Sequence, residues 1–179
     1  MFMTGEIKKR GLVDIFEVIK TRRSIRKFTD KPVQDETIDR IIDAGIWAPS
    51  GLNNQPWKFG VIRENGLKRE IAALTRYSKI VLGADTLITV FLDHSRSYDR
   101  TKDAMAVGAC IQNMLLTIHS LGLGAVWLGE ILKNREKVLE LVGGSDDIEL
   151  MAIIAVGHPE QKAVTGNRKD MDQAVLFRK

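Results

Sequence analysis

The chain has 179 residues, of which 44% are hydrophobic and 28% are charged, and its formal net charge is +4. These values are typical of a globular protein, and the length most simply allows one domain with a continuous core. No apolar run is long enough to cross a membrane, because the region 80–92 is short and is interrupted by Asp85.

Residues 1–11 are expected to form a flexible leader, and they lack the apolar core of a signal peptide. The lack of such a core leads us to expect a cytoplasmic protein. Cys110 is the single cysteine, which excludes an internal disulfide and fits a reducing compartment. His94, His119 and His158 lie far apart with no cysteine pair, which favours no metal site. Cys110 and His119 fall in an apolar helical stretch, where packing is the expected role of the cysteine and a core or interface position that of the histidine.

Hydrophobic periodicity and turn residues predict helices and strands along the whole chain. The expected elements are a helix capped by Asp14 with Ile15, Phe16, Val18 and Ile19 on its apolar side, an extended segment at 28–33, a helix from Gln34 or Asp35 to Trp47, a strand at 57–62, a helix near 67–74, a strand at 86–92, a helix at about 102–121, a strand at 125–128, a helix at 134–142, a strand at 151–156 and an added edge strand at 175–177. This pattern indicates one α+β domain over 1–179, with four or five strands and helices packed around them.

The helix expected at about 102–121 is apolar on most of its sides. The series from Met105 to Leu121 shares its turns with Val107, Ile111 and Met114. Such a helix needs a cover besides its own sheet, and a second subunit would supply it. We predict a homodimer on this ground.

The stretch Ala48–Trp57 is a loop with many hydrogen-bonding side chains. Pro49 and Pro56 favour extended neighbours and Gly51 lets the chain bend, so the stretch is not helical. Its serine, asparagine and glutamine side chains suit a flat heteroaromatic ligand with carbonyls and ring nitrogens. A connection rich in turn formers is the simpler alternative, and the basic stretch 22–27 favours the ligand.

Gly122 and Gly124 do not form a dinucleotide-binding fingerprint. Trp127 stands where the third glycine belongs, and these glycines end a helix and open a strand, the reverse of the fingerprint. The basic residues leave nucleic-acid binding as an alternative, which predicts strong salt-dependent retention on DNA. No helix-turn-helix, zinc-finger or RNP-type pattern accompanies them, so we expect neither a nucleic acid nor a membrane as partner.

Two motifs stand about two dozen residues apart, Arg22-Arg23-Ser24-x-Arg26-x-Phe28 and Ala48-Pro49-Ser50-x-x-Asn53-x-Gln55-Pro56-Trp57. A long apolar helix, the stretches 122–129 and 155–159, and basic residues near the C-terminus follow. From Asp14 onward, these segments in this order resemble the FMN-dependent nitroreductase family. The resemblance implies a three-layer α+β fold with a mostly antiparallel sheet, a long central dimer helix and a homodimer with FMN at the subunit interface.

The resemblance also implies that basic residues bind the phosphate end of FMN. Guanidinium groups hold a dianionic phosphate through paired hydrogen bonds, and a cation near the N1–C2=O edge stabilises the negative charge of the reduced ring. The residues implied here are Arg22, Ser24 and Arg26, with Arg23 alongside, for the phosphate, the ribityl chain or the pyrimidine edge, and Arg168 or Lys169 for the phosphate.

A second implied set lies along the flavin ring, where a backbone N–H reaches N5. No protein side chain is implied to be catalytic, because flavin N5 carries the chemistry. Arg76 and Lys79 are open candidates for the N1–C2=O edge. The residues implied along the ring are Leu128, Gly129 and Glu130 and, from the partner subunit, Pro49, Ser50, Gly51 and Asn53, with Gln55 supporting that loop.

The activity implied by the resemblance is that of an NAD(P)H-dependent oxidoreductase. NADH or NADPH gives hydride to the flavin, and a nitroaromatic, quinone or related electron-poor acceptor then takes the same place, in a ping-pong cycle. Two alternatives stay open: a branch of the family that dehalogenates an aromatic or breaks down its flavin, and a non-catalytic FMN-binding protein.

Overall fold

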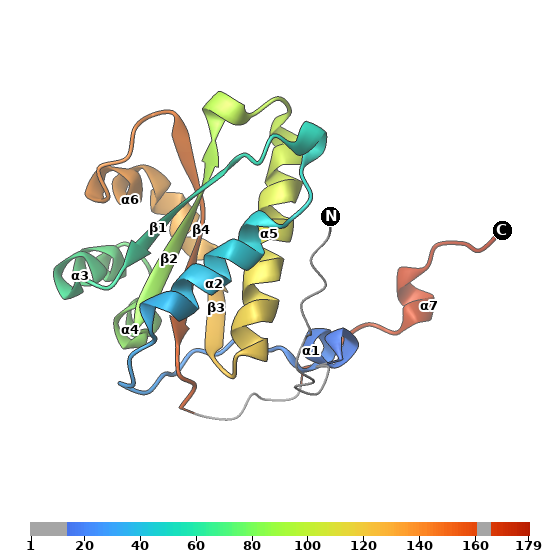
Figure 1. Ribbon diagram of the computed structural model, residues 1–179, viewed down its shortest axis with the longest axis horizontal. Coiled ribbons are helices and arrows are strands. Elements are labelled where there is room, and N and C mark those ends of the chain that lie inside the picture. Colours follow the sequence, from blue (N-terminus) through green and yellow to red (C-terminus); the bar gives the residue numbers. More distant parts are fainter. Residues whose placement is uncertain (1–13, 161–165) are drawn as a thin grey trace, which may run out of the picture.

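The computed structural model describes residues 14–160 and 166–179, which form three layers (Figure 1). An antiparallel four-stranded sheet, in the order β1-β2-β4-β3, is the middle layer. Helices α2 and α5 cover one face, and α3, α4 and α6 cover the other (Figure 1). The expected α+β fold is therefore confirmed. The bounds are α1 Ile15–Thr21, α2 Asp35–Ile46, β1 Trp57–Ile62, α3 Asn65–Ala73, α4 Ser78–Gly83, β2 Thr86–Asp93, α5 Arg100–Ser120, β3 Gly124–Leu128, α6 Arg135–Leu141, β4 Ile148–Gly157 and α7 Met171–Ala174.

The two central strands, β2 and β4, explain the long apolar runs of the sequence. Every residue of β2 is buried, and so is β4 from Ala152 to Gly157, because helices cover both faces of the sheet. Strand β4 begins at Ile148, three residues before the predicted strand. β3 is an outer strand and pairs with β4 from Gly124 opposite Gly157 to Leu128 opposite Ile153.

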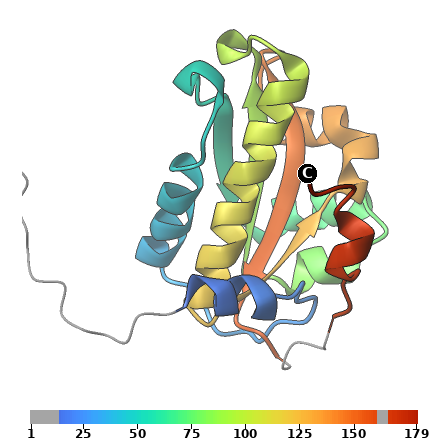
Figure 2. The same ribbon diagram turned by 90° about the vertical axis from the view of Figure 1, so that its right-hand side faces the viewer.

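Helix α5 runs across one face of the sheet beside α2 (Figure 2). It begins after Asp99, whose carboxylate accepts hydrogen bonds from the backbone N–H groups of Thr101 and Lys102 at 3.1 and 2.9 Å. It ends before Gly122, which adopts the left-handed φ of +75° that favours glycine at a helix C-terminus. The structure thus confirms the predicted helix within two residues at its start.

The structure corrects two expectations and adds one element. Ile15, Phe16 and Ile19 are 62, 59 and 48% exposed, because α1 lies across the C-terminal end of α5 and not on the sheet (Figure 2). The edge strand expected at 175–177 is wrong, since this segment follows α7 and pairs with no strand of the described chain. Helix α4 was not expected.

The predicted leader lies within 1–13, outside the described residues. None of the helices that the structure describes combines the length and the apolar character needed to cross a membrane.

Candidate functional site

The segment that carries the first motif crosses the start of β3 and the end of β4. The backbone N–H of Ile25 donates to the carbonyl of Ala125 at 2.8 Å, next to a parallel bridge between Ser24 and Ala125. Gly124 and Gly157 face each other in the sheet beneath this segment. A Cβ on Gly124 would lie 2.7 Å from Ile25 Cγ2, so glycine allows the close approach.

Three arginines gather beside this crossing. Arg22 and Arg23 border one hollow, and burial, then the charges of Arg168 and Arg23, lower the pKa of Arg22. A Cβ on Gly166 would lie 2.9 Å from Arg23 Nε and 3.4 Å from Arg168 Nη1. Along the described ranges, none of these arginines forms an ion pair with a carboxylate.

The Arg23 side chain is held in this cluster with one donor unused. Its Nη1 donates to the carbonyls of Lys20 and Arg22 at 2.6 and 2.8 Å, but its Nε is buried and has no hydrogen-bond partner in the described structure. A buried, unpartnered donor in a positive cluster favours an anion as the missing acceptor. Ser24 and Arg26 lie exposed on the same segment, and Lys169 lies exposed beside Arg168.

The loop of the second motif has an unusual backbone. Leu52, Asn53 and Gln55 adopt positive φ values of 55, 55 and 48°, which side chains other than glycine rarely take. Ser50 Oγ accepts a hydrogen bond from the Gln55 backbone N–H at 3.0 Å, and Gln55 Nε2 donates to the Asn53 carbonyl at 3.3 Å. The Gln55 side chain thus contributes a hydrogen bond within the loop, and its role at a flavin site stays a prediction. Backbone strain of this kind concentrates at functional sites.

A buried carboxylate, which the sequence analysis did not single out, anchors this loop to the start of α5. Asp103 Oδ1 accepts a hydrogen bond from Asn54 Nδ2 at 2.7 Å, and its Oδ2 accepts from Ser97 Oγ at 2.7 Å. Backbone N–H groups of Tyr98 and Asp99 also donate to Oδ2, at 3.0 and 3.1 Å. Burial alone would raise the pKa of Asp103, but these hydrogen bonds lower it.

The loop and the arginine cluster lie at opposite ends of α5 within one chain. Pro49, Ser50 and Gly51 border a shallow pocket with Ala106, whereas Arg22 and Arg23 border a hollow with Ile118. Ala106 and Ile118 are twelve residues apart, which is about 18 Å along the helix. One chain therefore does not bring the two predicted halves of the site together.

The end of β3 carries the third predicted group. Leu128 is buried, and Gly129 is exposed in a place where a Cβ would meet nothing within 4 Å. The Glu130 carboxylate points to the turn that contains Thr75, whose Oγ1 donates a hydrogen bond to Oε2 at 2.6 Å. Lys133 pairs with the other oxygen, and these two contacts lower the pKa of Glu130, with help from the Arg76 backbone N–H.

Because Thr75 and the Arg76 backbone N–H both contact the Glu130 carboxylate, Arg76 lies in a turn next to Glu130. Neither the position of Arg76 nor the contact of Thr75 with Glu130 could be predicted from the sequence, because no local pattern links residues 55 positions apart. Lys79 lies exposed on α4.

Comparison with known proteins decides the family. The sequence profile of the Nitroreductase family matches residues 19–77 and 67–158, most of the chain. The chain belongs to the nitroreductase family. A Methanothermobacter thermautotrophicus protein named NADH dehydrogenase/NAD(P)H nitroreductase is 35% identical to this family member over 174 residues, 96% of this chain and 90% of that protein.

Solved structures agree with the family. A nitroreductase of Desulfovibrio desulfuricans, crystallised in complex with FMN, is 44% identical and superposes with a TM-score of 0.89, over 93% of this chain and 98% of that one. The NADPH:FMN oxidoreductase of Vibrio harveyi, in complex with NAD⁺, is 27% identical with a TM-score of 0.86, over 92% of this chain and 77% of that one.

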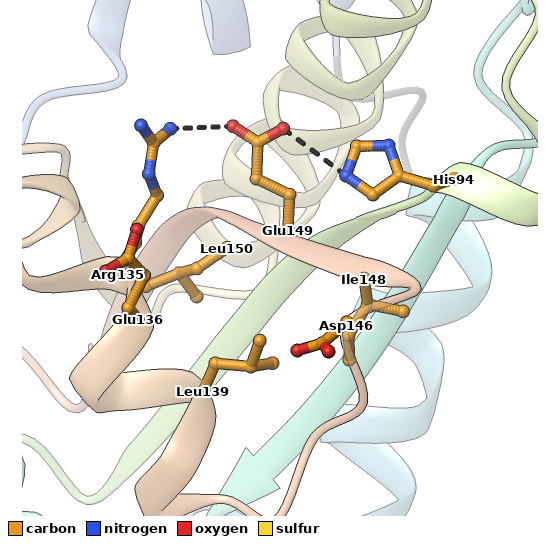
Figure 3. Close-up of a pocket in the computed structure, with 8 residues that line it drawn as sticks. All are labelled: His94, Arg135, Glu136, Leu139, Asp146, Ile148, Glu149 and Leu150. Carbon is orange, nitrogen blue, oxygen red and sulfur yellow. Dashed lines mark hydrogen bonds and ion pairs between the residues drawn. The ribbon is translucent and has the colours of Figure 1, made fainter.

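Another pocket of this nitroreductase-family chain lies where α6 meets the start of β4 (Figure 3). Glu149 stands between Arg135 and His94 in Figure 3, with Nη1 of Arg135 2.8 Å from Oε1 and Nε2 of His94 3.7 Å from Oε2. Arg100 Nη2 pairs with the same Oε1 at 2.9 Å. Glu149 thus connects β4 to α5, to α6 and to the segment after β2. A structural role therefore accounts for the charges of this pocket.

Proposed function

We propose that this chain is an FMN-dependent oxidoreductase that takes hydride from NADH or NADPH and reduces nitroaromatics, quinones or related electron-poor acceptors. It would act as a single FMN-binding domain in the cytoplasm. The observation that carries the proposal is the cluster of Arg22, Arg23 and Arg168, which has no carboxylate partner among the described residues and leaves Arg23 Nε buried without an acceptor. A dianionic phosphate fits this need, because guanidinium groups pair with two of its oxygens at once.

The direction of the backbone supports the rest of the assignment. The motif segment forms a parallel bridge with β3 at Ser24, and β3 runs on to Leu128, the residue before Gly129. A flavin with its phosphate on the arginines would therefore place its ribityl chain beside Ser24 and Arg26 and its ring beside Gly129. The open space above Gly129 would leave room for the ring, and a backbone N–H of this turn would reach ring N5.

A homodimer is the second part of the proposal, because one chain leaves the loop about 18 Å along α5 from the arginines. A two-fold axis that pairs two α5 helices antiparallel would bring Pro49, Ser50, Gly51 and Asn53 of one copy over the arginines of the other. Apolar side chains exposed near α5 support such a contact, since they gain from burial. They are Phe16, Trp47, Leu52 and Met105, at 59, 80, 87 and 69% exposure.

The protein's part in the chemistry is to bind and orient. When bound, FMN supplies the redox chemistry, accepting hydride from the nicotinamide and reducing the acceptor, so no protein nucleophile is needed. Glu130 and Thr75 hold the turn that carries Arg76 at the edge of this open face. Both substrates would use that face in turn, which predicts ping-pong kinetics.

The test is the visible spectrum of the purified protein, followed by anaerobic addition of NADH and then NADPH. Flavin bands that bleach at a catalytic rate, with parallel double-reciprocal plots for the acceptor, are the expected result. Bands that stay oxidised would favour a non-catalytic FMN-binding protein, and a colourless protein that refuses added FMN would refute the proposal. Arg168→Ala should weaken FMN binding about tenfold or more, and Lys169→Ala much less, because Arg168 lies beside Arg22.

A further inference from the structure

His119 is a titratable group at the arginine cluster that neither the family motifs nor the proposed chemistry uses. It lies in the last turn of α5 and borders the same hollow as Arg22 and Arg23. Its Nε2 is 2.9 Å from Thr21 Oγ1 on α1. The imidazole is therefore held where the phosphate end of the cofactor would bind.

The hydrogen bonds define which nitrogen of the neutral ring carries the proton. Thr21 Oγ1 donates its single proton to the Glu17 carbonyl at 2.6 Å. It has no second proton for His119, so Nε2–H of His119 donates to Thr21 Oγ1. Nδ1 is then the nitrogen that keeps a lone pair, and a proton added to the ring goes there.

The groups that face His119 come from several elements. Arg22 and Arg23 face it from the segment after α1, with Arg168 of the tail beside Arg22. α1 presents the Thr21 hydroxyl, and Leu123 and Ala125 present apolar surface. Burial, followed by the charges of Arg22 and Arg23, lowers the pKa of His119, so the ring is neutral at pH 7 while the arginines face no anion.

We propose that, in a substantial fraction of molecules at pH 7, His119 takes up a proton from solvent when a phosphate dianion binds to Arg22, Arg23 and Arg168, and that it then adds a fourth positive charge to the phosphate site. The inference rests on the proposed FMN function and adds proton linkage to it. Burial and the arginine charges together keep the free ring neutral; the dianion offsets the arginine charges, and its own charge favours the imidazolium. This step involves no electron transfer and no nicotinamide, because the only change is the uptake of a proton from solvent.

The sign of the linkage follows from the two protonation equilibria. Binding raises the pKa of His119, so FMN affinity is highest below the free-site pKa and falls as the pH rises through the pKa of the complex. A rise of about one unit corresponds to about a tenfold change in affinity. The phosphate of FMN has the opposite effect on affinity, because it takes up a proton and loses one negative charge below about pH 6.

The experiment uses the full chain freed of flavin. Titration calorimetry with FMN at pH 7, in buffers of different ionisation enthalpy, counts the protons taken up, and flavin fluorescence gives the affinity from pH 6 to 8.5. Riboflavin, which lacks the phosphate, is the matched control ligand. His119→Gln is the matched variant, since its side-chain amide keeps a donor for Thr21 and does not titrate; His119→Asn replaces it if that variant does not fold.

Wild type is expected to take up a substantial fraction of a proton with FMN and none with riboflavin, and the variant is expected to take up none with either ligand. Its FMN affinity should also lose the fall between pH 6 and 8.5. Equal proton uptake by wild type and variant, or FMN binding by wild type without uptake, would overturn the inference and leave the proposed function standing. Failure of wild type to bind FMN at any pH would overturn the proposed function itself.

Discussion

Replacing Asp103 with asparagine tests whether this carboxylate anchors the Pro49–Trp57 loop. Asp103 Oδ1 accepts from Asn54, while Oδ2 accepts from Ser97 Oγ and two backbone N–H groups. An asparagine has one oxygen, so its NH₂ group must face either Asn54 or these three donors. Rotating the Asn54 amide by half a turn would let its buried Oδ1 accept from the new NH₂ group. The same rotation would point Oδ1 at the Arg96 carbonyl, which in the wild type accepts a hydrogen bond from Asn54 Nδ2 at 2.9 Å.

At least one buried polar group therefore loses its partner in Asp103→Asn, and the remaining hydrogen bonds lose their charge. The expected loss is about 2 kcal/mol of unfolding free energy at pH 7, or about 4–8 °C in Tm. Asp39→Asn is the control, because Asp39 is exposed on α2 and makes no side-chain hydrogen bond in the described structure, so its change should stay within about 0.5 kcal/mol.

The pH dependence provides a second readout. The folded-state pKa of Asp103 lies below the ordinary value of 3.8, so the carboxylate contributes its full stability above that value. This contribution is lost as the pH falls through the folded-state pKa, and the difference between wild type and Asp103→Asn should then shrink. Thermal melts from pH 7 to pH 3 measure both effects. Equal Tm values for Asp103→Asn and Asp39→Asn at pH 7 would refute the reasoning.

Two further predictions concern the contact between α2 and α5. Gly45→Ala should lower the free energy of unfolding, measured in urea, by about 1–3 kcal/mol, because a Cβ there would lie 2.8 Å from Met114 Cγ and 3.1 Å from Cys110 Sγ. Gly83→Ala is the control, because a Cβ at that position would have no atom within 4 Å. Cys110 is buried and its pKa is raised to about 12 by burial, so the native protein should not react with a thiol reagent at pH 8 and should react fully in denaturant. Fast reaction of the native thiol would contradict this packing.

The sequence predicted most elements because their signals are local. Alternation in 57–62, the nearly all-apolar run before Asp93 and the helical spacing after Asp99 each depend on neighbouring residues. Helix α4 has six residues, too few to show a period. The prediction at 175–177 failed because an apolar triplet forms a strand only where another strand pairs with it, which the triplet itself does not encode.

The candidate site divides in the same way. Arginines at the two ends of the chain were expected on one phosphate, and the fold does bring Arg22, Arg23 and Arg168 together. Asp103, the Thr75–Glu130 contact and the pairing of His119 with Thr21 were not foreseen, because each joins residues 49 to 98 positions apart. A motif identifies side chains that meet a ligand, but the residues that hold those side chains in place depend on the tertiary fold.

In the proposed homodimer, the position of the loop at the far end of α5 would link assembly to cofactor binding. If each flavin contacts the arginines of one copy and the loop of the other, dimer formation must raise FMN affinity at each site, and two bound flavins must tighten the dimer by the product of the two per-site factors. Phe16 and Met105 would contribute apolar burial at about 25 cal/mol per Å² without touching the flavin. Leu52 differs from both, since its 87% exposed side chain lies in the strained loop itself. A substitution at Leu52 should therefore change dimer stability and cofactor affinity together, whereas one at Phe16 or Met105 should change affinity only through the dimer.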